Sequence, residues 1–116
     1  MGVTYARGSI TGKSGSRPYE FLVDTGATWL SIPPADIGVL ELEALGRNAP
    51  ITTPNGVFYL PLYRADGVLE GVPFSTYLVE AYIPIVGYRL LQDLGFVVDV
   101  LEERIALRTE WLGNLP

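Results

Sequence analysis

The sequence contains no histidine and no cysteine. Without these two residue types, one chain cannot build the Ser-His-Asp or Cys-His arrangements that activate a nucleophile in many hydrolases. A zinc site made of the usual nitrogen and sulfur ligands is excluded for the same reason. Carboxylates remain as the side chains best suited to catalysis, and the chain has 13 acidic residues.

Positive charge and long apolar runs are also scarce. The chain has 8 lysine and arginine residues and a net charge of −5, and its cations are scattered, so we expect no nucleic-acid partner. No apolar run approaches the ~20 residues of a membrane span, and the first residues lack the features of a signal peptide. Because there is no cysteine for a disulfide framework, we expect a cytoplasmic protein. Because no apolar run is long enough for a membrane span, we expect no association with membranes.

The composition that is present favours one β-rich domain. A length of 116 residues, 48% of them hydrophobic, suits a single domain over residues 1–116 with a real core. Short apolar segments alternate with turn residues, in the order 3–11, 19–23, 28–32, 51–53, 57–63, 68–69, 72–79, 96–100 and 104–107, and predict strands. We therefore predict an all-β fold, a closed β domain with one short helix near the C-terminal end.

Turn and helix signals divide these strands. Asn55-Gly56 predicts a hairpin, because this dipeptide favours the tight turn between paired strands. A short helix is expected between Ala35 and Leu45, with Gly46 as its cap. The clearest helical pattern is Tyr88–Leu94, which places three leucines on one face and is followed by Gly95 at the C-terminal cap.

The segment Leu22–Ala27 is an apolar strand that runs into an Asp-Thr-Gly turn. Most Asp-x-Gly sequences only form turns, because the aspartate bonds to nearby backbone and glycine permits a tight bend. Asp24 nevertheless has the most distinctive context of the acidic residues, since it directly follows an apolar strand.

Three segments, taken in order, resemble the retropepsin-like aspartic proteases, in particular the small single-domain members found outside viruses. The first is Leu-Val-Asp-Thr-Gly-Ala at 22–27. The second is the predicted hairpin at Pro54-Asn55-Gly56, where the family has its flap. The third is Ile85-Val86-Gly87 with the helix that follows it, which is similar to the apolar-apolar-glycine segment and C-terminal helix of the family. The order and spacing of the parts cover about residues 3 to 108, nearly the whole chain.

The resemblance implies an aspartic endopeptidase, in which two carboxylates share one proton and activate a water. Asp24 would supply one carboxylate, Thr25 would reach across to the turn of a partner, and the amide of Gly26 would hold the carboxylate in place. One chain contains a single such turn, so a homodimer is expected, with a peptide or unfolded protein as substrate. Neither a cofactor nor a metal is implied.

The resemblance also implies which residues contact the substrate: Ala27, Thr28, Trp29, Thr53, Pro54, Asn55, Gly56, Val57 and Ile85. We expect the cleft walls to be largely apolar, with contributions from Leu30, Ile32, Val57, Ile83 and Ile85. The terminal segments 1–4 and 111–116 are the candidates for joining the subunits. Viral members commonly have an acidic residue and an arginine at the positions of Thr28 and Tyr88, so the interface should differ in detail.

Other interpretations stay open at this point. The same fold can serve as a dimerising or peptide-binding module with little or no hydrolysis. A carbohydrate- or small-ligand-binding barrel is also conceivable, although it leaves the Asp-Thr-Gly turn and the distal glycine unexplained. Trp29 and Phe58 either line substrate pockets or belong to the core, where aromatic residues are more often found.

Overall fold

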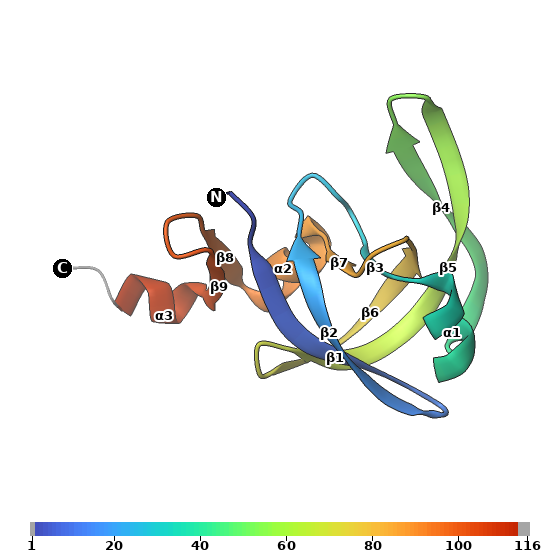
Figure 1. The fold of residues 1–116 in the computed structure, drawn as a ribbon, viewed down its shortest axis with the longest axis horizontal. Coiled ribbons are helices and arrows are strands. Elements are labelled where there is room, and N and C mark those ends of the chain that lie inside the picture. The colour runs from blue at the N-terminus through green and yellow to red at the C-terminus, as the bar shows by residue number, and fades with distance from the viewer. Residues whose placement is uncertain (1, 114–116) are drawn as a thin grey trace.

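The computed structural model describes residues 2–113. Its elements, labelled in Figure 1, are β1 (Tyr5–Gly12), β2 (Gly15–Val23), β3 (Leu30–Ile32), α1 (Pro34–Leu40), β4 (Glu43–Thr53), β5 (Gly56–Leu69), β6 (Val72–Glu80), β7 (Ile85–Val86), α2 (Tyr88–Leu94), β8 (Phe96–Asp99), β9 (Arg104–Leu107) and α3 (Arg108–Gly113). Strands dominate, as the sequence predicts.

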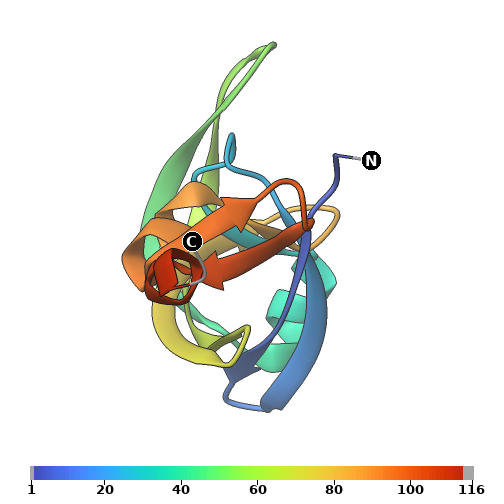
Figure 2. The same cartoon turned by 90° about the vertical axis from the view of Figure 1, so that its left-hand side faces the viewer.

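Six of the strands close into a barrel. They are hydrogen-bonded in the order β1-β2-β7-β3-β6-β5, and β5 pairs again with β1. β4 pairs with the outer part of β5, so that the two strands form a long hairpin that rises above the barrel (Figures 1 and 2). The prediction of a closed β domain is therefore confirmed.

The core fills this barrel with alternate residues of its strands. The largest fully buried side chains are Phe21, Ile10, Leu30, Ile32, Leu69, Leu78 and Val86. Leu90 and Leu91 of α2 and Ile105 of β9 pack against the same cluster. The alternation follows from strand geometry, in which successive side chains point to opposite faces.

Two glycines allow the barrel to close where β1 meets β5. Gly8 pairs with Leu69 and Ile10 pairs with Gly67. A Cβ atom on Gly67 would lie 2.1 Å from the carbonyl oxygen of Ser9, and one on Gly8 would lie 2.3 Å from that of Val68. No side chain fits at such distances, so the closure depends on glycine at both positions.

Helix α2 spans Tyr88–Leu94, as predicted, and Gly95 caps its C-terminal end with φ +78°. The expectation for α1 was wrong in its end point. This helix begins with Pro34 at its first turn and stops at Glu41, which adopts the left-handed conformation, and β4 already begins at Glu43. Gly46, the expected cap, instead lies where the β4–β5 register shifts between Ala44 and Asn48.

Part of the C-terminal segment is helical. Residues 111–113, which belong to one of the two candidate joining segments, lie in α3. Met1 and residues 114–116 of the two expected joining segments lie outside the described residues. Within residues 2–113, the helices are too short to cross a membrane.

The β4–β5 hairpin is longer than predicted, and its turn lies within the predicted segment Pro54-Asn55-Gly56. Thr53 pairs with Gly56, which places Pro54 and Asn55 at the centre of the turn. The ring of Pro54 fixes its φ at about −65°, and Gly56, with φ +122°, is the first residue of β5. The hydroxyl of Thr53 stabilises the turn, since it donates to the carbonyl of Gly56 and accepts from the amide of Asn55.

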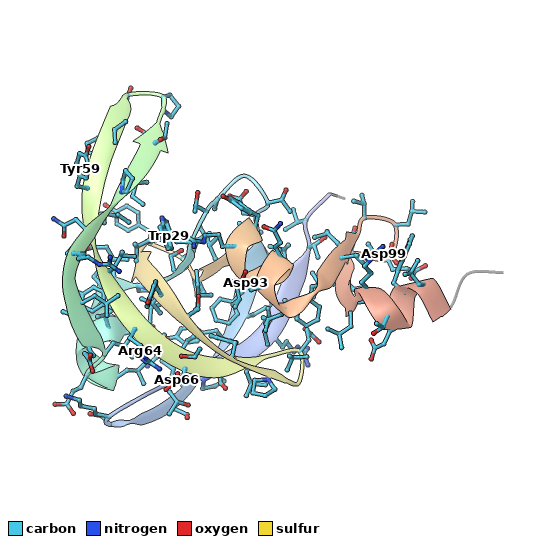
Figure 3. All side chains as sticks on the ribbon, turned by 180° about the vertical axis from the view of Figure 1, so that it is seen from behind. Trp29, Tyr59, Arg64, Asp66, Asp93 and Asp99 are labelled. Carbon is cyan, nitrogen blue, oxygen red and sulfur yellow. The ribbon has the colours of Figure 1, made fainter. Side chains whose placement is uncertain are left out.

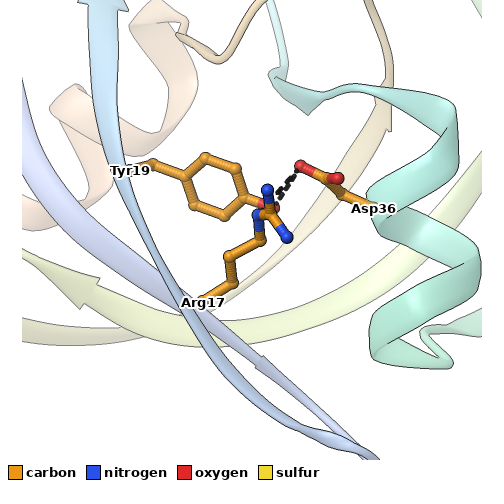
Figure 4. A network of polar contacts seen from close by, with 3 residues as sticks. All are labelled: Arg17, Tyr19 and Asp36. Carbon is orange, nitrogen blue, oxygen red and sulfur yellow. Dashed lines mark hydrogen bonds and ion pairs between the residues drawn. The ribbon is translucent and has the colours of Figure 1, made fainter.

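A polar contact ties α1 to β2 (Figure 4). The hydroxyl of Tyr19 donates to Oδ2 of Asp36 at 2.8 Å, and Nε of Arg17 lies 3.4 Å from the same oxygen. Burial, together with the hydrogen bond to Asp36, raises the pKa of Tyr19 well above its ordinary value of 10.0. The folded protein therefore retains this proton more tightly than the unfolded chain.

Replacing Gly67 with alanine should destabilise the barrel, because the added Cβ atom meets backbone that cannot move aside. We expect Gly67→Ala to lower the free energy of unfolding by about 1–3 kcal/mol in urea denaturation. The matched control is Gly38→Ala in α1, where no atom lies within 4 Å of the added carbon. That change should be neutral or stabilising by up to about 1 kcal/mol. Equal stability of the two variants would contradict the role of Gly67 in closure.

The Tyr19 contact predicts a pH dependence of stability. Since folding raises the pKa of Tyr19, the protonated hydroxyl contributes its full stabilisation of the folded state below pH 10.0. This stabilisation is lost as the pH rises above that value. Tyr19→Phe should lower the free energy of unfolding by about 1 kcal/mol at neutral pH. Above pH 10.0, the stability of the wild type should fall more steeply than that of the variant, as measured by urea denaturation across this range. Parallel pH curves would show that the Asp36 contact does not stabilise the protonated tyrosine.

Candidate functional site

Asp24 lies at the end of β2, where the strand leaves the barrel wall. β2 runs parallel to β7, with Leu22 paired to Ile85 and Val23 paired to Val86. The amide of Asp24 continues this ladder and donates to the carbonyl of Val86 at 3.0 Å. The backbone of Asp24 is therefore fixed by the sheet, while its side chain, half-buried, stands at the sheet edge.

The backbone of the Asp-Thr-Gly turn holds the Asp24 carboxylate in place. The amide of Gly26 donates to Oδ1 of Asp24 at 2.9 Å, and the amide of Ala27 donates to the carbonyl of Asp24 at 3.0 Å. Within residues 2–113, this amide is the one hydrogen-bond donor to the Asp24 carboxylate. Oδ2 is thus available to a water, a substrate or a second carboxylate. Thr25 and Gly26 are exposed.

Gly87 locks the turn to the start of α2. The amide of Tyr88 donates to the carbonyl of Ala27 at 2.9 Å, and that of Arg89 donates to the carbonyl of Thr28 at 3.4 Å. A Cβ atom on Gly87 would lie 2.6 Å from the carbonyl oxygen of Ala27 and 2.8 Å from that of Trp29. The distal glycine that the resemblance singled out therefore permits the close approach that positions Asp24.

A cavity of about 370 Å³ opens beside Asp24, between the barrel and the base of the β4–β5 hairpin. Of the site residues predicted from the sequence, those that line this cavity are Asp24, Gly26, Ala27, Thr28, Trp29 and Ile85. Leu30 and Ile32, expected in the cleft walls, are instead buried in the core. Of the other expected wall residues, Val57 and Ile83 are exposed and do not line the cavity.

The expected flap residues lie farther out. Thr53, Pro54, Asn55, Gly56 and Val57 form the tip of the hairpin and do not line the cavity in this conformation. Phe58 is 54% exposed on the same tip, so it belongs to neither the core nor the cavity. Trp29 is half-buried and packs against the small cluster of Ala49, Leu62 and Val79 at the hairpin base.

The structure adds residues that the sequence did not reveal: Ser31, Pro50, Ile51, Thr52, Leu60, Val79, Glu80 and Ala81. The alternation of buried and exposed residues along β4 could have indicated Ile51, which follows the same face as Ala49. Residues 79–81 carry no recognisable motif. They reach the cavity because β6 pairs with β3 next to the Asp24 turn.

No metal site accompanies these residues. Within residues 2–113, no group of three or more acidic side chains lies close enough together to hold a metal ion. Asp24 and Glu80 are the two carboxylates that line the cavity in one chain.

The closed barrel, the Asp-Thr-Gly turn and the glycine-to-helix segment together make up a retropepsin-like fold. Among solved structures, EIAV protease complexed with the inhibitor HBY-793 matches this chain with a TM-score of 0.61 and 22% sequence identity. The match covers 80% of this chain and 88% of that one. No family model and no curated protein sequence matches the chain. At this level of identity the likeness shows the fold alone.

Gly87→Ala should disturb the site through the backbone. The three nearest atoms to the added carbon are all backbone atoms between 2.6 and 2.8 Å away, so no side-chain rotation relieves the clash. We expect a loss of about 1–3 kcal/mol in the free energy of unfolding and a shift of the Gly26 amide resonance in NMR spectra. Gly113→Ala, where no atom lies within 4 Å, is the control. An unchanged Gly26 resonance in Gly87→Ala would disprove the coupling between the two segments.

Proposed function

We propose that the protein is an aspartic endopeptidase whose active site forms when Asp24 of two chains meets on a two-fold axis. The observation that carries this proposal is the Asp24 carboxylate, which is held by the Gly26 amide and faces a cavity large enough for peptide side chains. Each domain, residues 1–116, would then contribute half of one site.

The chemistry needs two carboxylates that share one proton, because two like charges so close together do not both ionise. The ionised Asp24 takes a proton from a water, whose oxygen attacks the carbonyl carbon of the peptide bond. The protonated Asp24 of the second chain gives its proton to the carbonyl oxygen. The first Asp24 then gives the proton that it took from the water to the nitrogen, and the carbon–nitrogen bond breaks, so that the amine leaves. The second Asp24 takes a proton from a hydroxyl of the intermediate as the carboxylic acid product forms, and the dyad returns to its starting state.

The surroundings of the turn suit a homodimer. Thr25 and Gly26 are exposed, and Thr25 would reach the turn of the second chain. The carbonyl of Thr4 accepts from the amide of Val23 at 2.9 Å, so the N-terminal segment runs beside the end of β2 (Figure 1). Val3 and Tyr5 on this segment are 45% and 51% exposed. Apolar side chains of this kind beside the turn would be buried by a second copy.

The cavity favours an extended peptide as substrate. Ile51, Leu60, Val79 and Ile85 supply apolar walls, which suit hydrophobic side chains next to the cleaved bond. Residues 53–57 at the hairpin tip would contact one side of the peptide, and Ala27, Thr28 and Trp29 would contact the opposite side. This assignment of substrate contacts is part of the proposal.

Asp24→Asn is the decisive variant. We expect it to reduce cleavage of a denatured protein by at least about a thousandfold, because the dyad loses its base, and pepstatin should inhibit the wild type. Asp66→Asn, an exposed acid on β5, is the matched control and should cleave normally. Sedimentation should find a dimer for all three proteins.

Two results would overturn the proposal: cleavage that survives Asp24→Asn, or a wild type that sediments as a monomer at concentrations where it cleaves. A stable dimer that binds peptides but cleaves none at any pH would instead identify a peptide-binding module.

A further inference from the structure

A second hollow of about 310 Å³ adjoins the cavity beside Asp24 and shares Trp29 and Pro50 with it. This hollow, which we call the outer hollow, is lined by Trp29, Arg47, Asn48, Ala49, Pro50, Leu62, Tyr77 and Arg89. Figure 3 shows Trp29 between the β4–β5 hairpin and α2, on which Asp93 is labelled. The two hollows are therefore neighbours that meet at Trp29 and Pro50.

The outer hollow is positively charged. Arg47 and Arg89 line it, and no carboxylate does. Among the described residues, Arg17 and Arg104 form ion pairs, whereas none is found for Arg47 or Arg89. The chain as a whole carries a net charge of −5, so two unpaired guanidinium groups at one hollow make the local charge opposite in sign to that of the chain.

One of the two arginines is held in place. The guanidinium carbon of Arg89 lies 4.9 Å from the centre of the Trp29 ring, a cation–π contact. Trp29 in turn packs against Ala49, Leu62 and Val79. Arg89 therefore lies at a fixed wall of the outer hollow, with its hydrogen-bond donors free for a ligand. An arginine held by stacking loses little further freedom when it binds a carboxylate.

The cavity beside Asp24, which we call the inner cavity, has charged lining residues of the opposite sign. Asp24 and Glu80 line it, and it has no cation among its described lining residues. A peptide that extends from the cavity beside Asp24 to the outer hollow would thus meet acidic groups at the centre and basic groups at the flank. This arrangement disfavours a carboxylate near the reacting bond and favours one farther along the peptide.

We propose that the outer hollow binds the carboxylate of an aspartate or glutamate side chain on the flank of an extended peptide substrate. Arg47 and Arg89 would each offer a planar fork of donors, with Asn48 and Tyr77 as neutral partners beside them. The inference deepens the proposed peptidase function and rests on it for the cleavage reaction, but peptide binding can be measured without cleavage.

The proposed homodimer would have one outer hollow in each subunit, and therefore one on each side of the shared site. An acidic residue should then be accepted on either flank of the cleaved bond. A peptide with one on both flanks should gain from both hollows.

The test uses synthetic peptide libraries with an apolar centre and glutamate, glutamine or lysine placed at each flanking position in turn. Binding is measured by fluorescence polarisation with the Asp24→Asn protein, and cleavage by mass spectrometry with the wild type. We expect glutamate to be preferred over glutamine about tenfold at one position on each flank, and the preference to shrink at high salt.

The variants Arg47→Gln and Arg89→Gln, made singly and together in the Asp24→Asn protein, should remove the preference and leave binding of the glutamine peptide unchanged. Arg89→Lys should retain part of it. Arg108→Gln, on α3 and outside both hollows, is the matched control and should keep it entirely. Circular dichroism checks that each variant is folded.

The outcomes separate the two proposals. A glutamate preference in binding without cleavage by the wild type supports the outer hollow and contradicts the peptidase. Cleavage without a glutamate preference supports the peptidase and overturns the outer hollow. A preference that persists in the double arginine variant, or no binding of any glutamate peptide, also overturns it.

Discussion

The close contact between Gly87 and the Asp-Thr-Gly turn is the constraint on which the site depends. Because Gly87 has no side chain, the start of α2 can approach the turn closely enough for the Tyr88 amide to reach the carbonyl of Ala27 at 2.9 Å. The Val86 carbonyl meanwhile fixes the amide of Asp24. The carboxylate thus has a defined position before any ligand arrives, which reduces the reorganisation that catalysis would require.

The same contact links the site to the core and to the outer hollow. Leu90 and Leu91 anchor α2 in the main cluster, while Arg89, the residue before them, stacks on Trp29 outside this cluster. One short helix therefore supports the turn on one side and presents a cation on the other. The contrast between an acidic centre and a basic flank arises from this compact arrangement, not from the overall charge of the chain.

Sequence reasoning succeeded where a signal is local and failed where it is not. The Asp-Thr-Gly turn, the hairpin at residues 53–56 and the helix with its cap at Gly95 each follow from a few neighbouring residues. The end of α1 at Glu41 does not, because a non-glycine residue takes the left-handed conformation there. The sequence also did not reveal that Val79 and Glu80 line the cavity beside Asp24. They reach it because β6 pairs with β3, and this pairing arises only in the closed barrel.

Closure of the barrel through Gly8 and Gly67 bears on the order in which the chain folds. The β1–β2, β4–β5 and β5–β6 hairpins join neighbours in sequence, whereas the β1–β5 ladder joins residues 8–11 to residues 66–69. Pairing of such distant segments carries a larger loop-closure cost and slows folding. We expect the hairpins to form early and this ladder late, so that the facing edges of β1 and β5 stay unpaired until the barrel closes and are open until then to pairing with other chains.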